Sequence, residues 1–232
     1  MDWDGDGKKD LLCGDSAGQV TFFRNTGTAE TSVLAAGVRL KAGGEEIKGV
    51  NARYEKGPDG GYHIQSSPGK IIGVYSKIHA ADWDGDGLLD LLVGQDGPNE
   101  KQDLLFYRNA GPAGAPALEK PVVIELPGPH LSRPSPYVVD WDGDGTPDLL
   151  CGTEGAEVWF FRNTGTHRAP ALAKGVRLDL KGDGFEKGYR CRIEVTDWNN
   201  DGKRDLLVGN FYSINSPGGG KAGGNVWLFL GR

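Results

Sequence analysis

The feature that most constrains the fold of this chain is an acidic loop that occurs four times in nearly the same form. The copies read DWDGDGKKDLLCG from Asp2, DWDGDGLLDLLVG from Asp82, DWDGDGTPDLLCG from Asp140 and DWNNDGKRDLLVG from Asp197. Self-similar segments at a nearly constant period are typical of repeat architectures, in which each copy forms one supersecondary unit. The chain is therefore expected to consist of four related units.

Each loop places an acidic residue at positions 1, 5 and 9 and an aspartate or asparagine at position 3, with glycine at position 6. Packing does not explain this density of carboxylates, because unpaired negative charges repel one another. Ca²⁺ prefers about six to eight oxygen ligands, and alternate acidic residues that turn on a glycine can surround one point. The sequence thus predicts bound Ca²⁺, up to four ions, one in each repeat.

The net charge of the 232-residue chain is −6, and the loops account for it. They contain 15 of the 32 acidic residues, so the acidity belongs to the predicted cation sites and says nothing about a basic partner. No basic stripe with interleaved aromatic residues is present, which speaks against nucleic acid as a partner. No apolar stretch approaches the length of a membrane span.

A recurrent series of short strands surrounds each loop. A first strand follows directly, at Leu11–Cys13, Leu91–Val93, Leu149–Cys151 and Leu206–Val208. A second begins at Gln19, Asp103, Glu157 and Asn225, and in the first three repeats it closes on an Asn-Thr-Gly or Asn-Ala-Gly turn. A third strand is expected within the segments that start at Val33, Leu118 and Ala171, and a fourth leads into the next loop, before Asp82, Asp140 and Asp197.

Four short strands per unit, without helical periodicity, predict an all-β chain and favour the four-stranded blades of a β-propeller. A single domain is expected over residues 1–232, with repeats at approximately 1–73, 74–131, 132–188 and 189–232 and an insertion at about 42–73. The series lacks one inner strand at its start and one outer strand at its end. The four blades could form a small closed ring, or the chain could belong to a larger or oligomeric ring through its open edges.

The pattern D-x-D-x-D-G-x-x-D followed by Leu-Leu-Val-Gly resembles the loop of the FG-GAP/VCBS repeats, the blades of integrin-α-like calcium-binding propellers. The resemblance spans nearly the whole chain. It implies side-chain ligands at positions 1, 3, 5 and 9 and a main-chain carbonyl ligand at position 7. The implied ligands are Asp2, Asp4, Asp6, Lys8 and Asp10; Asp82, Asp84, Asp86, Leu88 and Asp90; Asp140, Asp142, Asp144, Thr146 and Asp148; and Asp197, Asn199, Asp201, Lys203 and Asp205.

An EF-hand begins in the same way but needs a bidentate glutamate at position 12 and flanking helices. Position 12 is cysteine or valine here, within a predicted strand, which excludes that motif. The fourth loop departs from the pattern at Asn199 and Asn200, and the loss of one negative charge at position 3 is expected to weaken that site.

Other repeated residues are interpreted as scaffold. The tryptophan at position 2 is expected in the core between repeats, in all four copies: Trp3, Trp83, Trp141 and Trp198. Arg24, Arg108 and Arg162 are expected to bridge to a neighbouring repeat. Cys13 and Cys151 take the place of valine in the other copies and are expected to be buried, because a free cysteine packs as a small hydrophobe.

Function should then lie in residues that do not repeat. We expect a calcium-stabilised binding, adhesion or scaffold module without catalysis, with a glycan or protein ligand. One alternative is a lectin-like propeller that uses the insertion, the loop at 210–224, or the set His79, Tyr137, Tyr189 and Arg190. Another is a polysaccharide lyase or hydrolase, although the four histidines, His63, His79, His130 and His167, form no recognisable constellation.

Localisation has to be inferred indirectly. Met1 leads straight into the first acidic loop without a signal peptide, and we interpret the chain as an excised or engineered segment. The expected calcium affinity is that of extracellular modules, so a secreted or cell-surface parent protein is expected.

Overall fold

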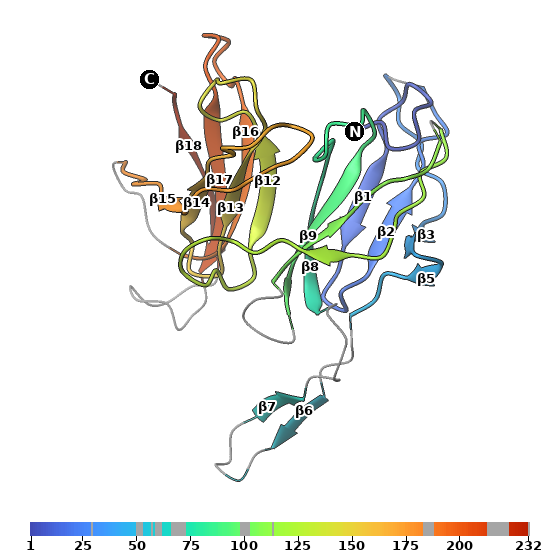
Figure 1. Ribbon diagram of the computed structural model, residues 1–232, viewed down its shortest axis with the longest axis horizontal. Helices are drawn as coiled ribbons and strands as arrows, with labels where there is room; N and C mark the ends of the chain where they lie inside the picture. The colour runs from blue at the N-terminus through green and yellow to red at the C-terminus, as the bar shows by residue number, and fades with distance from the viewer. Residues whose placement is uncertain are drawn as a thin grey trace. The chain divides into compact units, whose positions relative to one another are not determined.

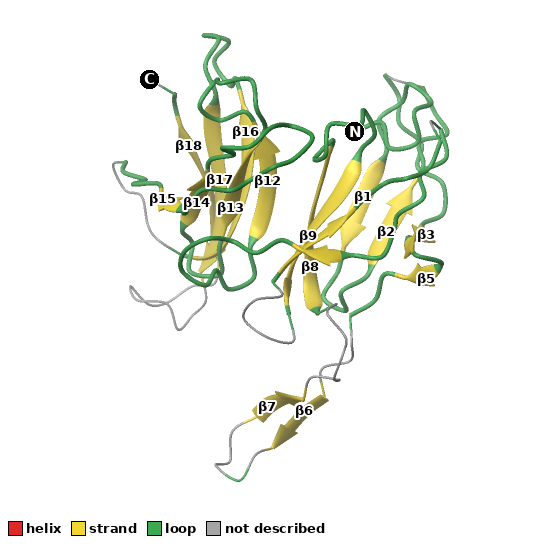
Figure 2. Cartoon of the chain, in the orientation of Figure 1, coloured by secondary structure: helices red, strands yellow, loops and turns green. Residues whose placement is uncertain are grey.

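The protein was analysed as a computed structural model. It describes residues 1–28, 30–49, 53–56, 58, 62–65, 73–97, 103–112, 114–182, 188–212 and 223–231. The secondary structure of these residues consists of β-strands joined by turns and loops, with no helix among them (Figure 2). The predicted all-β class is therefore confirmed. No helix in the described part of the chain is long and apolar enough to cross a membrane.

The chain divides into two compact units, residues 1–125 and 126–232 (Figure 1). In unit 1 the first sheet has the order β1-β2-β3, and the second has the order β11-β10-β9-β8. The strand bounds are β1 Leu11–Gly14, β2 Val20–Phe23, β3 Val38–Arg39, β8 Val74–Ala81, β9 Asp90–Asp96, β10 Leu104–Tyr107 and β11 Val122–Val123. Two hairpins, β4 (Lys41–Ala42) with β5 (Glu45–Glu46) and β6 (Arg53–Lys56) with β7 (Tyr62–Gln65), lie in the predicted insertion or at its start.

Unit 2 also contains two antiparallel sheets. The third sheet has the order β12-β13-β14-β15, and the fourth has the order β16-β17-β18. The bounds are β12 Ser135–Val139, β13 Asp148–Gly152, β14 Val158–Phe161, β15 Val176–Arg177, β16 Tyr189–Thr196, β17 Asp205–Tyr212 and β18 Gly223–Phe229. Every predicted strand of the repeats is present, and in the described residues the first and fourth sheets have three strands each. The predicted repeat boundaries and domain extent stay predictions.

Each unit has an apolar core that joins its two sheets. In unit 1 Leu12 and Val20 of the first sheet pack in one cluster with Leu91, Leu105 and Tyr107 of the second. In unit 2 the corresponding cluster includes Leu150 and Val158 of the third sheet and Cys191, Ile193 and Val208 of the fourth. Because side chains alternate along a strand, one face of each sheet supplies these residues. Neighbouring repeats within a unit thus share a core.

The backbone also joins neighbouring repeats. In unit 1 the turn after β1 accepts hydrogen bonds at Asp15 and Ser16 from the start of β8, over 2.9 and 3.3 Å. In unit 2 Thr153 and Glu154 accept corresponding bonds from the start of β16, over 2.9 and 2.8 Å. The strand is bulged at this point, between Val74 and Lys77 in β8 and between Tyr189 and Arg192 in β16.

An unusual backbone conformation recurs at one position of the repeat. Tyr75, Arg133 and Arg190 have φ angles of 61, 49 and 55°, in the left-handed region that large residues rarely adopt. All three stand seven residues before the first aspartate of the next loop. At Tyr75 and Arg190 the conformation coincides with the bulges of β8 and β16, whereas β12, which follows Arg133, pairs with β13 without a register shift. Since the conformation recurs at one repeat position, it belongs to the repeat scaffold and is not a sign of a ligand site.

Two expectations about burial are wrong at the ends of the series. Trp3 and Trp83 are buried and Trp141 is half-buried, but Trp198 is 60% exposed among the described residues. Cys151 is fully buried in β13, between β12 and β14, whereas Cys13 is exposed. Among the described strands β1 pairs only with β2, so the inner side of Cys13 is left open.

Several candidate ligand residues lie outside the described part of the chain. This is the case for most of the predicted insertion and for most of the loop at 210–224. In the β6–β7 hairpin the structure describes the backbone but not the side chains, so Tyr54, Tyr62 and His63 receive no placement.

The joint between repeats gives a prediction at the glycine four residues after the position 9 aspartate of each repeat. A Cβ atom on Gly152 would lie 2.8 Å from the Cys191 carbonyl oxygen, and one on Gly14 would overlap the Ser76 carbonyl. At the same repeat position, Gly209 would meet Arg192 at an ordinary 3.9 Å. We expect Gly152→Ala to lower the free energy of unfolding by about 1–3 kcal/mol. Gly209→Ala is the matched control in urea denaturation, and an equal loss in both variants would contradict the joint.

A second prediction concerns Tyr137, whose hydroxyl links the two sheets of unit 2. It lies 2.8 Å from Glu194 Oε1 and 3.1 Å from the Val195 carbonyl oxygen. Burial, together with the hydrogen bond to Glu194, raises the pKa of Tyr137 from 10.0 to about 12. The neutral phenol is therefore favoured by folding, and its stabilisation is present below pH 10 and lost as the pH rises towards 12.

Tyr137→Phe should cost about 1 kcal/mol of unfolding free energy at pH 8. The difference from the unsubstituted protein should shrink when denaturation is repeated between pH 10 and pH 12. A difference that stays constant over this range would argue against the buried, hydrogen-bonded phenol.

Candidate metal centre

The aspartate at position 9 anchors each acidic loop to its sheet. One carboxylate oxygen accepts the backbone N–H of the tryptophan at position 2, and the other accepts an N–H just after the second strand. The nitrogen–oxygen distances lie between 2.7 and 3.0 Å in all four copies. Asp90, Asp148 and Asp205 are fully buried, and Asp10 is 8% exposed. A buried carboxylate needs such partners, and here both of its oxygens receive them.

The aspartate at position 1 folds the loop back on itself. Asp2, Asp82, Asp140 and Asp197 each accept the N–H of the glycine at position 6, over 2.8–3.3 Å. The aspartate at position 5 accepts the N–H of position 7 through Oδ1, over 2.9–3.0 Å. The path of the loop is thus fixed largely by bonds between its own carboxylates and its backbone.

Two positions of the loop need a left-handed backbone. Position 6 is glycine in every copy, with φ between 82 and 89°. Position 4 is glycine in three copies, with φ of 71–78°, and Asn200 takes the same conformation in the fourth, with φ of 58°. Asparagine is among the few residues that tolerate this region, so its presence preserves the loop.

The loops bring their acidic side chains together. Oxygen atoms lie within 4.8 Å of one another in three groups: Asp2, Asp4 and Asp6; Asp82, Asp84 and Asp86; and Asp140, Asp142 and Asp148. Position 9 belongs to the group in the third loop only. The fourth loop, which is described throughout, contributes no group of three carboxylates within this limit, since Asn199 replaces one of them. The ligand roles of all twenty predicted residues, including the position 7 carbonyls, stay predictions.

One carboxylate oxygen is unsatisfied at the same place in the first two loops. Asp4 Oδ1 and Asp84 Oδ1 are buried and have no hydrogen-bond partner among the described residues. Burial, followed by the charge of Asp10, raises the pKa of Asp4, and Arg24 opposes this rise. Burial also raises the pKa of Asp90 to about 6. A hard cation would supply the partner that these oxygens lack, so the residues present fit a bound Ca²⁺.

The repeated arginines contact the acidic loop of their own repeat. Arg24 pairs with Asp4 and Asp6, and the equivalent pairs are Arg108 with Asp84 and Asp86 and Arg162 with Asp142 and Asp144. The expectation that these side chains bridge to a neighbouring repeat is therefore wrong. The register explains the difference, because each arginine follows the last paired residue of the second strand, which ends beside the loop. A different residue does bridge repeats: Arg204, in the fourth loop, lies 3.3 Å from Asp140 in the third.

The asparagine that follows each of these arginines has a structural role that was not predicted from the sequence. Asn25, Asn109 and Asn163 are buried, and each accepts two backbone N–H groups through Oδ1, over 2.9–3.1 Å. In the second and third repeats the side-chain amide also donates to the carbonyl at loop position 8, over 3.1 Å. The Arg-Asn pair recurs in three repeats, and this recurrence could have indicated that the asparagine has a structural role.

The non-repeated candidates are only partly brought together. Tyr189 and Arg190 both contact Phe211: the two rings are 6.1 Å apart, and the guanidinium lies 5.2 Å from the Phe211 ring centre. Arg190 also pairs with Glu154 over 2.8 Å. Tyr137 faces Glu194 instead, and His79 lies in β8 of unit 1.

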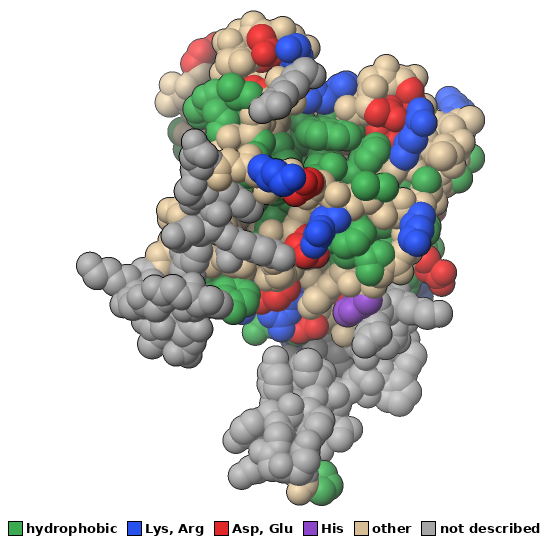
Figure 3. Space-filling view, turned by 90° about the vertical axis from the view of Figure 1, so that its left-hand side faces the viewer, with side chains coloured by type: hydrophobic (Ala, Val, Ile, Leu, Met, Phe, Trp, Pro, Cys, Tyr) green, Lys and Arg blue, Asp and Glu red, His purple; other side chains and the backbone are tan. Residues whose placement is uncertain are grey.

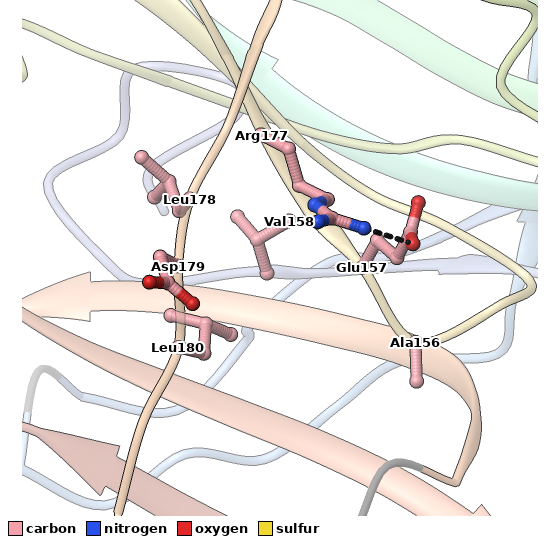
Figure 4. A pocket seen from close by; sticks show the side chains of 7 residues that line it. All are labelled: Ala156, Glu157, Val158, Arg177, Leu178, Asp179 and Leu180. Carbon is pink, nitrogen blue, oxygen red and sulfur yellow. Dashed lines mark hydrogen bonds and ion pairs between the residues drawn. The ribbon is translucent and has the colours of Figure 1, made fainter.

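A shallow hollow of about 140 Å³ lies beside β14 and β15 (Figure 4). Val158, Leu178 and Leu180 line it, and Arg177 pairs with Glu157 at its side over 3.1 Å. It is smaller than the roughly 300–1,000 Å³ typical of small-molecule sites. On the face drawn in Figure 3, basic and acidic side chains are interspersed and are not gathered by sign.

Comparison with known proteins places the repeats in a family. No curated protein matches the chain. Among solved structures, the Photorhabdus luminescens Tc holotoxin pore is similar over 88% of this chain, with 17% identity and a TM-score of 0.43, and this chain spans 8% of that one. The model of the FG-GAP-like repeat matches residues 82–151 and 140–208, together more than half of the sequence. Each match runs from one acidic loop into the strand after the next, and the chain therefore belongs to the FG-GAP-like repeat family.

Proposed function

We propose that this chain is a calcium-stabilised β-propeller module that serves as a scaffold or adhesion surface and performs no catalysis. The observation that carries the proposal is the pair of buried, unpartnered oxygens, Asp4 Oδ1 and Asp84 Oδ1, at the same position of two acidic loops. The repeats of the FG-GAP-like family support it, since such repeats often bind Ca²⁺.

In this proposal each loop holds one ion through positions 1, 3, 5 and 9 and the carbonyl at position 7. The ion would offset the charge of the clustered carboxylates and, in the first two loops, give the position 3 oxygen its missing contact. The residues themselves already set the path of the loop, through the backbone bonds of positions 1, 5 and 9. Calcium would thus stabilise a geometry that exists before it binds.

The propeller form extends the arrangement within each unit. Two sheets share a core and a backbone joint there, as neighbouring blades would, and the same contacts repeated around an axis would give a ring. We propose a small ring of four blades, or membership of a larger or oligomeric ring through the open edges. A secreted or cell-surface parent protein fits this proposal, because FG-GAP repeats are typical of extracellular proteins.

A glycan-binding role is the second candidate. Tyr189 and Phe211 form an aromatic pair beside Arg190, and Tyr189 is 39% exposed. Aromatic faces with a neighbouring cation can receive a sugar ring, especially an acidic one. Glycan-array binding that is lost in Tyr189→Ala would support this role, whereas unchanged binding would move the site elsewhere.

Calcium dependence is the direct test of the main proposal. Each site should stabilise the fold by about 2.7 kcal/mol when Ca²⁺ exceeds the dissociation constant a hundredfold. We expect dissociation constants of about 10⁻⁴–10⁻³ M, with the fourth loop weakest because of Asn199. Thermal melts in EDTA and in 10 mM CaCl₂, together with calorimetric titration, measure both quantities. An identical melting temperature in the two solutions would exclude the calcium assignment.

Substitutions at two aspartates of the second loop should distinguish a loss of calcium binding from a loss of stability of the loop itself. Asp84→Asn weakens a proposed ligand, so it should reduce the stabilisation by Ca²⁺ and leave the melt in EDTA nearly unchanged. Asp90→Asn leaves one buried backbone N–H without an acceptor, so it should cost about 1–3 kcal/mol in both solutions. If Asp90→Asn is harmless in EDTA, the anchoring role of position 9 is wrong.

A further inference from the structure

The three repeated arginines contact the acidic loops with the same atoms in each repeat. Nε lies 2.6–2.7 Å from Oδ2 of the aspartate at position 3. Nη2 lies 2.9–3.3 Å from Oδ2 of the aspartate at position 5. We call Arg24, Arg108 and Arg162 the clamp arginines. Each spans two carboxylates of one loop, so the rigid fork of the guanidinium offsets part of their charge and fixes their spacing.

The clamp leaves the other oxygens of these carboxylates alone. Oδ1 of position 5 accepts a backbone N–H of the loop, over 2.9–3.0 Å. Oδ1 of position 3 is the buried oxygen that has no partner in the first two loops. The clamp arginine therefore approaches the cluster from outside, while the unsatisfied oxygens remain for another cation.

The fourth repeat lacks the clamp and one acidic residue together. Phe229 pairs with Leu206 as Phe161 pairs with Leu149, so Leu230 occupies the position of Arg162. In the same repeat Asn199 stands at position 3, where the other loops have aspartate. Counted without the basic residues at loop positions 7 and 8, which are Lys8 and Lys9 in the first loop and Lys203 and Arg204 in the fourth, the loop aspartates and the clamp together carry a charge of −3 in every repeat. A missing positive charge thus accompanies a missing negative charge.

We propose that the clamp arginines are built-in counter-ions, which keep the acidic loops folded without calcium and lower the affinity of those loops for it. The inference rests on the proposed calcium function. Four carboxylates within nine residues repel one another, and the guanidinium offsets part of this repulsion before any metal binds. The same positive charge then opposes the arrival of a second cation.

Positioning is the competing effect, because a clamp that orients ligands could raise affinity instead. The loops depend little on the arginine for their shape. Position 1 is held by the N–H of position 6, and position 9 by two further N–H groups, in every repeat. These bonds remain when the arginine is removed. The charge effect should therefore exceed the positioning effect.

The test compares two double variants that lose the same charge. Arg108→Gln/Arg162→Gln removes two clamps. Arg39→Gln/Arg177→Gln removes two arginines that occupy equivalent positions in β3 and β15. Arg39 pairs with Asp15 over 3.2 Å, and Arg177 pairs with Glu157 over 3.1 Å, as Figure 4 shows for the second pair. Both variants and the unsubstituted protein are melted in EDTA and titrated with CaCl₂ by calorimetry.

The clamp variant should melt about 2–4 °C lower in EDTA than the control variant. Its second and third sites should bind Ca²⁺ about tenfold more tightly, so that its gain in melting temperature with Ca²⁺ is larger. The control variant should keep the calcium affinity of the unsubstituted protein. Weaker or unchanged calcium binding in the clamp variant would overturn the inference, because the arginines would then be positioning or inert.

Introducing the missing aspartate and the missing arginine into the fourth repeat tests the counter-ion role without removing a clamp. Asn199→Asp should tighten the fourth site and lower the melting temperature in EDTA, and Leu230→Arg added to it should reverse both changes. Failure of the reversal would count against the counter-ion role. If the unsubstituted protein binds no Ca²⁺, the proposed function fails and the affinity part of the inference fails with it. A lower melt of the clamp variant in EDTA would then still support the counter-ion role alone.

Discussion

The buried aspartate at position 9 is the contact on which each repeat depends. It joins the start of the acidic loop to the end of the second strand through two backbone N–H groups, and it does so in all four copies. A buried carboxylate with fewer partners would be strongly destabilising. The repeat therefore carries a charge in its interior only because the loop and the strand both direct donors at it. This explains why the fourth repeat, which lost an acid at position 3, retains Asp205.

Recurrence within one chain separates scaffold from function. The left-handed residues Tyr75, Arg133 and Arg190 would suggest strained, functional positions if each were met alone. They occupy one place in the repeat, and at Tyr75 and Arg190 the strand bulges where it meets the preceding repeat of the same unit. The glycines that end β1 and β13 have the same explanation, because the next inner strand passes close to them. Such features, shared by several repeats, thus belong to the scaffold.

The sequence predicted the strand order and the acidic clusters, because both follow from local patterns. Alternation and turn residues define the strands, and acids at fixed spacing around a glycine define the loop. It did not predict burial at the ends of the series: Trp198 and Cys13 have the residue types of their buried equivalents but are exposed among the described residues. It also misplaced the partners of the arginines, since the partner of a long side chain depends on the register between strand and loop. Local sequence patterns determine which strands and loops form, whereas the surrounding strands and repeats determine the burial and the partners of each side chain.

The charges of the loops show how the scaffold and the cation are balanced. A site built only of carboxylates would bind calcium tightly but would unfold without it, since nothing would offset the repulsion. A site fully neutralised by arginine would fold alone and would have no reason to bind a cation. Three repeats lie between these limits, with four aspartates and one guanidinium, and the fourth has three aspartates and Leu230. Counting only the loop aspartates and the clamp arginine, both arrangements sum to −3, while Lys8 and Lys9 add positive charge to the first loop and Lys203 and Arg204 to the fourth. In the proposal, the loops fold before calcium arrives and still gain stability from binding it.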